Sequence, residues 1–237
     1  MSTSIQKVAV ITGASQGIGA GLVAAYRELG YGVVATSRSI AASADPDVVT
    51  VQGDIADPAT AERVIDAAVK RFGRVDTLVN NAGIFTAKPF TEFTQEDYDR
   101  TIAINVGGFF RITQLAVGRM LAQGGGHVVN IGSSLADNAD SGVPAVLASL
   151  TKGGLAAATK ALAIEYATRG VRANTVALGT IKTPMHNPEW HEMLAGLQPV
   201  KRLGEISEVV DAVLFLENAP FVTGEVLHVD GGVSAGH

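Results

Sequence analysis

Cysteine is absent from this 237-residue chain, and aromatic side chains (5%) and charged side chains (17%) are both scarce. Without cysteine the protein has no disulfide, no cysteine-ligated zinc site and no cysteine nucleophile. No apolar run approaches ~20 residues without a charge or a glycine, so we expect no membrane span. The formal net charge of −5 and the lack of basic runs argue against nucleic acid as a partner. We also expect no bound metal ion.

The sequence also shows no boundary between domains. No Pro-, Ser- or Gly-rich linker and no run of charges interrupts it, so we expect one domain over residues 1–237. Residues 1–7 lack the charged start and apolar run of a signal peptide. These features predict a soluble, cytoplasmic protein.

Short β-rich runs alternate with longer helical patterns. The predicted strands are Lys7–Thr12, Tyr31–Thr36, Val48–Gln52, Thr77–Asn80, Val128–Ile131, Val171–Val176 and Val226–Val229. The predicted helices are Ile18–Leu29, Pro58–Phe72, Gln95–Gln123, Leu147–Thr168 and Ile206–Leu216. The near-continuous apolar character of these strands is typical of a sheet covered on both faces. The alternation therefore predicts an α/β fold with a doubly wound parallel sheet of about seven strands.

The first predicted strand runs directly into the segment Thr12–Gly19, which has the glycine spacing G-x-x-x-G-x-G. Gly13 permits a sharp turn, Gly17 permits close approach of a pyrophosphate, and Gly19 lets the following helix pack close to the sheet. The amino terminus of that helix then presents free N–H groups to the phosphates. Between a strand and an amphipathic helix, this spacing indicates a dinucleotide site rather than an ordinary turn.

Further segments resemble motifs of the short-chain dehydrogenase/reductase superfamily, and in particular of its 3-oxoacyl-[acyl-carrier-protein] reductases. They follow the family's order along almost the whole chain and comprise T-G-x-x-x-G-I-G at Thr12–Gly19, Gly53-Asp54-Ile55, N-N-A-G at Asn80–Gly83, Asn105, Asn130–Ser133, Gly224-Glu225 and Val229–Gly232. The resemblance implies a Rossmann fold that binds a nicotinamide dinucleotide. The cofactor contacts that it implies are Gly13, Ser15, Gln16, Gly17, Ile18, Gly19, Ser37, Arg38, Asp54, Ile55, Asn81, Ala82, Gly83, Lys152, Ile181 and Thr183.

The end of the second strand predicts the choice of dinucleotide. Relatives that prefer NAD place an Asp near the position of Ser37, and no acid stands there. Arg38 offers a guanidinium to a 2′-phosphate instead, which favours NADP over NAD. The other common NADP signal, a basic residue before the second glycine, is missing because Gln16 occupies that place. The alternative is that Arg38 is a solvated surface side chain.

The catalytic motif of this family is incomplete here. The segment Val146–Gly154 resembles its Tyr-x-x-x-Lys motif, but Ala148 stands at the tyrosine position, and Lys152 is kept. The resemblance assigns proton transfer to that tyrosine, the nicotinamide ribose to Lys152 and a bound water near the lysine to Asn105. The active serine is Ser133 or its neighbour Ser134. Ser133 precedes Ala148 by 15 positions, about two more than is common in the family, so the intervening loop reshapes the pocket.

Another group must supply the proton if the protein is an enzyme. His186 follows Thr183-Pro184-Met185 in the segment 183–203, where the family has a lid over the nicotinamide and the substrate, and histidine has a suitable pKa. A solvated histidine on the lid is the alternative. Weaker candidates lie in the reshaped loop: Asp137, Asp140 and Ser141.

Two functions therefore follow. The first is an NADP(H)-dependent oxidoreductase that acts on the carbonyl/alcohol pair of a small molecule, and the second is a silent dinucleotide-binding sensor or scaffold. We interpret Ala148 as a natural loss rather than an engineered change. The residues Met185, Trp190, Met193 and Leu194 indicate an apolar substrate pocket or, equally, core or interface. We expect a homo-oligomer, a tetramer, assembled through the helices Gln95–Gln123 and Leu147–Thr168.

Overall fold

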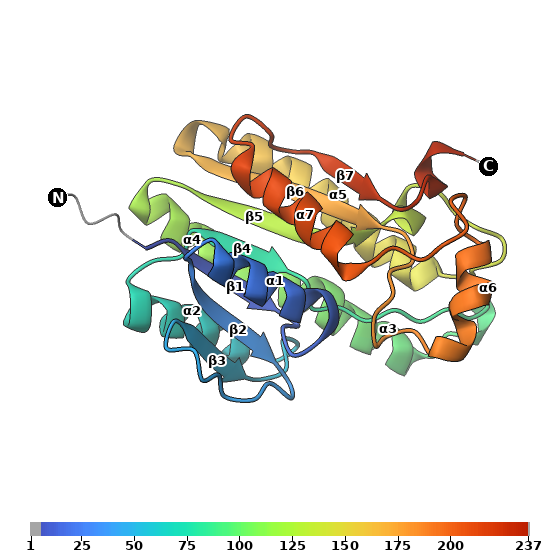
Figure 1. Ribbon diagram of the computed structural model, residues 1–237, viewed down its shortest axis with the longest axis horizontal. Coiled ribbons are helices and arrows are strands. Elements are labelled where there is room, and N and C mark those ends of the chain that lie inside the picture. Colours follow the sequence, from blue (N-terminus) through green and yellow to red (C-terminus); the bar gives the residue numbers. More distant parts are fainter. Residues whose placement is uncertain (1–5, 237) are drawn as a thin grey trace.

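The computed structural model describes residues 6–236 and contains one seven-stranded parallel sheet in the order β3-β2-β1-β4-β5-β6-β7 (Figure 1). The strands are β1 (Val8–Thr12), β2 (Gly32–Ser37), β3 (Val48–Gln52), β4 (Thr77–Asn80), β5 (Gly126–Ser133), β6 (Val171–Leu178) and β7 (Val226–Val229). The helices are α1 (Gly17–Glu28), α2 (Pro58–Phe72), α3 (Gln95–Thr101), α4 (Phe109–Gln123), α5 (Val146–Glu165), α6 (His191–Gly196) and α7 (Ile206–Asn218). This arrangement confirms the predicted doubly wound fold.

Alternate residues of each central strand enter different cores, as the pleat requires. Val8 and Val10 of β1 pack with α2, α4 and α5, while Ala9 and Ile11 pack with α1 and α7. The strands therefore need apolar side chains on both faces, which explains their continuous apolar runs. Within residues 6–236, no helix combines the length and the apolar character needed to cross a membrane.

The predicted long helix Gln95–Gln123 is wrong in its middle. A π-helical segment, Ile102–Gly108, separates α3 from α4. Asn105 lies within it, and its amide side chain bonds both the N–H and the carbonyl of Ile84 at 2.9 and 3.0 Å. Such wide turns interrupt helices mainly at functional sites. The local sequence does not reveal this π-helical segment, because Ile84, the partner of Asn105, lies outside the helix.

The strand β5 is longer than predicted, since it pairs with β6 over all eight residues from Gly126 to Ser133. Glycine at two of these positions hid the ends of the strand, because glycine is unfavourable in strands. The short helix α6 was not predicted. It lies in the segment 183–203, beyond the carboxyl ends of the central strands (Figure 1).

A buried polar network joins the amino-terminal ends of the strands to the end of α7. The Glu217 carboxylate accepts hydrogen bonds from Tyr26 (3.2 Å), Tyr31 (3.0 Å), Thr77 (3.0 and 3.1 Å) and His127 Nδ1 (2.9 Å). Burial opposes its ionisation, but the bonds from His127, Tyr31 and Thr77 outweigh burial and lower the pKa of Glu217 to about 2.

Two further side chains complete what we call the basal network. The Arg172 guanidinium donates to the carbonyls of Leu216 and Glu217 at 2.9 and 3.1 Å, which satisfies the free carboxyl end of α7. Asn174 donates to Nε2 of His127 at 3.0 Å. Because Nε2 accepts, the proton of the neutral ring lies on Nδ1 and faces Glu217. The members are Tyr26, Tyr31, Thr77, His127, Arg172, Asn174 and Glu217.

Candidate active site

The turn after β1 is shaped by a glycine and by the first residues after β4. Gly13 adopts a φ of +67°, and a Cβ atom there would lie 2.9 Å from Ala82 Cα. The Asn81 side chain donates to the carbonyls of Thr12 (2.9 Å) and Gly13 (3.1 Å), which fixes the turn. A larger residue at position 13 would be strained in φ and would collide with the chain after β4.

The amino terminus of α1 opens toward the same space. No side chain caps this helix, so its first N–H groups are available to an anion. A Cβ on Gly19 would lie 2.3 Å from the Gly13 carbonyl oxygen, so only glycine lets α1 approach the turn this closely. Thr183 and Pro184 of the lid segment lie 3.6 Å from the position of a Cβ on Gly17. The lid therefore lies directly over the glycine turn.

A cleft of about 280 Å³ lies at the carboxyl ends of β1, β2 and β4. It brings together thirteen of the predicted cofactor contacts: Gly13, Ser15, Gln16, Gly17, Ile18, Ser37, Arg38, Asp54, Ile55, Asn81, Ala82, Gly83 and Thr183. Gly19, Lys152 and Ile181 lie outside its lining. Lining residues outside the predicted cofactor contacts are Thr36, Ser39, Gly53, Ile84, Ile104, Pro184 and Met185. Several of these adjoin a predicted residue in sequence, which was the available signal.

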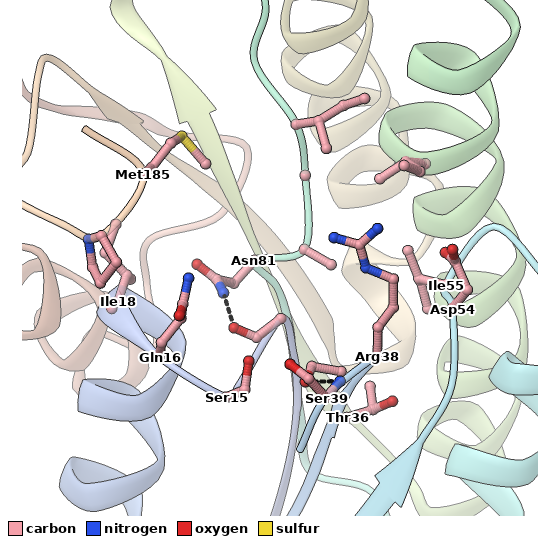
Figure 2. A pocket seen from close by; sticks show the side chains of 18 of the residues that line it. Ser15, Gln16, Ile18, Thr36, Arg38, Ser39, Asp54, Ile55, Asn81 and Met185 are labelled. Atoms are coloured by element: carbon pink, nitrogen blue, oxygen red, sulfur yellow. Dashed lines mark hydrogen bonds between the residues drawn. The ribbon is translucent and has the colours of Figure 1, made fainter. Parts of the chain in front are cut away.

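Two of the polar groups that line the cleft, the Arg38 guanidinium and the Thr36 hydroxyl, bear on its ligand, and neither has a partner in the described part of the chain. The Arg38 guanidinium forms no ion pair or hydrogen bond there, and Figure 2 shows it directed into the cleft between Asn81 and Ile55. The buried Thr36 hydroxyl also lacks a hydrogen-bond partner. An unsatisfied buried hydroxyl costs about 1–3 kcal/mol. The exposed Arg38 guanidinium is the accessible group of the two, and it suits a ligand that brings negative charge, as a dinucleotide does.

Lys152 of α5 lies beside this cleft. Its Nζ donates to the Ile131 carbonyl at 2.7 Å, and a Cβ on Gly83 would lie 3.2 Å from it. Burial lowers the pKa of Lys152 to about 8. Asn105 is adjacent, because its Oδ1 would lie 3.3 Å from the same Cβ.

The two candidate serines differ in their surroundings. The buried Ser134 hydroxyl donates to the Leu178 carbonyl at 3.1 Å. Ser133 is only half-buried, and its oxygen accepts from the Leu135 N–H at 3.3 Å, which leaves its own O–H to donate elsewhere. The hydroxyl of Ser133, unlike that of Ser134, is therefore available to a substrate. Ala148 is buried and ends in a methyl group.

The other candidate proton donors have partners. Nδ1 of His186 lies 2.9 Å from the Ile181 carbonyl, so Nδ1 carries a proton and Nε2 is the nitrogen left for other contacts. In the loop before α5, Asp137 pairs with His228 at 3.0 Å and Asp140 accepts from the Gly142 N–H at 2.7 Å. Both loop carboxylates are therefore engaged in contacts within the protein.

Comparison with known proteins adds to this geometry. Residues 13–234 match the family model described as enoyl-(acyl carrier protein) reductase. The 3-oxoacyl-[acyl-carrier-protein] reductase of Escherichia coli is 34% identical over 238 residues, which cover 96% of this chain and 97% of that protein.

Solved structures agree. The structure of ElxO with NADP bound matches with a TM-score of 0.91 at 30% identity and covers 98% of this chain and 100% of that one. A blue fluorescent protein from a metagenomic library, solved with NADPH, matches with a TM-score of 0.87 at 36% identity and covers 96% and 98%. With its motifs, sheet order and relatives in agreement, the chain belongs to the short-chain dehydrogenase/reductase superfamily of oxidoreductases.

Proposed function

We propose that the protein is an NADP(H)-dependent oxidoreductase that interconverts a carbonyl and an alcohol on a small molecule. The observation that carries this proposal is the unpaired Arg38 guanidinium, directed into a cleft whose glycine turn and uncapped helix suit a pyrophosphate (Figure 2). The neighbours ElxO and the blue fluorescent protein, which hold NADP and NADPH, support the same choice of cofactor.

The residues of the chain divide the work in this proposal. The first N–H groups of α1 would neutralise the pyrophosphate, and Arg38 with Ser37 would bind the 2′-phosphate. Lys152 would hold the nicotinamide ribose, and the free O–H of Ser133 would donate to the substrate oxygen. When bound, the reduced nicotinamide supplies the hydride. Asn105 would help to position Lys152, since its amide donates to the hydroxyl of the adjacent Thr151 at 3.2 Å.

The proton for the substrate oxygen is the step that the family motif leaves open here. His186 is a candidate in this proposal, because its Nε2 is free while Nδ1 is held by Ile181. A positioned general acid is worth ~10²–10⁴-fold in rate. Proximity alone can supply ~7–11 kcal/mol, so turnover without the tyrosine is compatible with the site.

A silent dinucleotide-binding protein is the second candidate, and Ala148 favours it. The alanine removes the one side chain on which the family motif relies for proton transfer, while the cleft keeps thirteen of the predicted cofactor contacts in its lining. A sensor or scaffold needs only the cleft.

One experiment distinguishes the oxidoreductase from the silent dinucleotide-binding protein. NADPH oxidation is followed with a panel of ketones and quinones for the wild type, Ala148→Tyr and Ala148→Phe. Since Ala148 is only 3% exposed, the added ring disturbs its neighbours, and the phenylalanine variant controls for that disturbance. We expect slow wild-type turnover and a gain of ~10²–10⁴-fold in Ala148→Tyr over Ala148→Phe. No turnover in any of the three, with NADPH bound, would establish the silent protein.

We further propose that the protein is a cytoplasmic homotetramer. Large apolar side chains are exposed on the two helices expected to form its interfaces, namely Phe110 (60%) on α4 and Leu150 (57%) and Ile164 (79%) on α5. Assembly through α4 and α5 would remove them from water. A monomer in light scattering at micromolar concentration would contradict this.

A further inference from the structure

Lys152 has more donors than the protein uses. An ammonium group carries three N–H bonds, and the only hydrogen bond of Lys152 Nζ within residues 6–236 goes to the Ile131 carbonyl at 2.7 Å. The side chain is half-buried beside Gly83, which lines the cleft. Two N–H bonds are therefore left for whatever occupies that side of the cleft.

The surroundings of this ammonium are uncharged. The groups that face it are the Ile131 carbonyl of β5, Gly83 after β4 and the Asn105 amide of the π-helical segment, and no carboxylate of the described chain pairs with it. Burial without a counter-charge lowers the pKa of Lys152 to about 8, from ~10.4 for an ordinary lysine. An acid whose pKa lies near the working pH is the most effective proton donor.

Other groups near the motif are less suited to release a proton. Ala148 has none to give, and the Ser134 hydroxyl is held by Leu178. The Ser133 O–H can donate a hydrogen bond, but an alcohol is too weak an acid to release its proton to a substrate. His186 competes for the role through its Nε2, from a lid segment rather than from the motif helix.

We propose that Lys152 itself protonates the substrate oxygen, in place of the missing tyrosine. In carbonyl reduction an Nζ–H bond breaks and its electron pair stays on nitrogen, while an O–H bond forms from a lone pair of the substrate oxygen. The carbonyl is reduced by the two electrons of the nicotinamide hydride. The neutral amine then takes a proton from water, and in alcohol oxidation it accepts the proton instead. This inference rests on the proposed oxidoreductase function.

Arginine separates proton transfer from binding. Its guanidinium keeps the charge and the donors of Lys152 but does not deprotonate. We expect Lys152→Arg to bind NADPH within about threefold of the wild type and to lose ~10²-fold or more in turnover. Small primary amines should restore turnover to Lys152→Ala, with a rate that depends on the pKa of the amine. Lys70→Arg, at an exposed position of α2, is the matched control and should leave both quantities unchanged.

A second readout needs no turnover. Acetylation by trace acetic anhydride, quantified by peptide mass spectrometry at a series of pH values, reports the free-amine fraction of each lysine. We expect the labelling of Lys152 to reach half its maximum near pH 8, with the exposed Lys70 as the reference. Labelling that rises only around ~10.4, as for an ordinary lysine, would overturn the inference.

The outcomes distinguish this inference from the proposed function. Wild-type turnover in Lys152→Arg, or no rescue of NADPH-bound Lys152→Ala by any amine, would overturn the role of Lys152 alone. No turnover by the wild type on any carbonyl, with NADPH bound, would refute the oxidoreductase function and this inference together.

Discussion

The two ends of the sheet both bury polar side chains, but they do so in opposite conditions. At the amino-terminal ends, the basal network gives every carboxylate oxygen of Glu217 a donor and ties Arg172 to helix carbonyls. At the carboxyl ends, the Thr36 hydroxyl and the Arg38 guanidinium have no partner in the described chain, and Lys152 has one. The basal network is buried and satisfied, whereas at the other end Thr36 is buried without a partner, Lys152 is half-buried and Arg38 is exposed.

This difference indicates which end serves folding and which serves a ligand. A satisfied buried network stabilises the fold, and losing one member leaves the others unpaired. An unsatisfied buried group costs free energy in the isolated protein and regains it when a ligand supplies the partner. Substitutions at the two ends should therefore affect different quantities.

The largest effect is expected at the centre of the basal network. Glu217→Ala leaves the hydroxyls of Tyr26, Tyr31 and Thr77 and the ring of His127 without their acceptor, which should cost about 3–5 kcal/mol in the free energy of unfolding. Urea denaturation measures it, with the exposed Glu62→Ala as control. A loss under 1 kcal/mol would mean that water replaces the carboxylate and that the two ends do not differ as described.

Acid should weaken the same end. The folded-state pKa of Glu217, about 2, lies below its ordinary value of 4.5, so its ionisation stabilises the fold above pH 4.5 and this contribution is lost as the pH falls toward 2. The shift corresponds to about 3 kcal/mol. The stability advantage of the wild type over Glu217→Gln should shrink by that amount across this range. A constant advantage between pH 5 and 2.5 would show that the carboxylate does not titrate as expected.

At the other end, Arg38→Ala should weaken binding and leave stability alone. Loss of charge-assisted hydrogen bonds to a 2′-phosphate, at about 1.5–3 kcal/mol, predicts a Kd for NADPH that rises about 10- to 100-fold. The Kd for NADH and the unfolding midpoint should not change, and Lys70→Ala at an exposed position of α2 should alter neither Kd nor the midpoint. Equal wild-type affinities for NADPH and NADH would sink this prediction.

The smallest expected effect gives the most direct comparison. The same threonine-to-valine substitution should change the free energy of unfolding in opposite directions at the two ends. Thr36 and Thr77 are both buried in strands, but only Thr77 has a partner. Without cofactor, Thr36→Val should raise the free energy of unfolding by about 1 kcal/mol, whereas Thr77→Val should lower it by about 1–3 kcal/mol. Thermal or urea unfolding of both variants tests this, and changes of the same sign would refute the distinction.

The sequence predicted the sheet and the glycine turn well, because both depend on local patterns. Apolar runs located all seven strands, and the spacing from Gly13 to Gly19 located the turn. The basal network went unpredicted, since His127, Arg172 and Glu217 come from elements far apart in the chain. A signal existed, because a histidine and an arginine stand in two buried strands, and a buried charge requires a partner.

The catalytic end was predicted only in part for a similar reason. The motifs identified Lys152 and left Ser133 and Ser134 as alternatives. They did not reveal that the Ile131 carbonyl accepts a hydrogen bond from the lysine or that the Leu178 carbonyl accepts one from Ser134. Those partners are backbone carbonyls. Every residue has one, so the residue types do not indicate which carbonyl accepts the bond. The π-helical segment around Asn105 was missed because its cause is a contact with Ile84 outside the helix.

The lid segment has one feature with a practical consequence. Trp190 is the single tryptophan of the chain, is 55% exposed, and stands immediately before α6. Intrinsic fluorescence excited at the indole band therefore reports the lid segment and no other part of the molecule. The emission of an indole overlaps the absorption of a reduced nicotinamide, so energy transfer from Trp190 would follow the closing of the lid over its ligand in real time, without a label and without turnover.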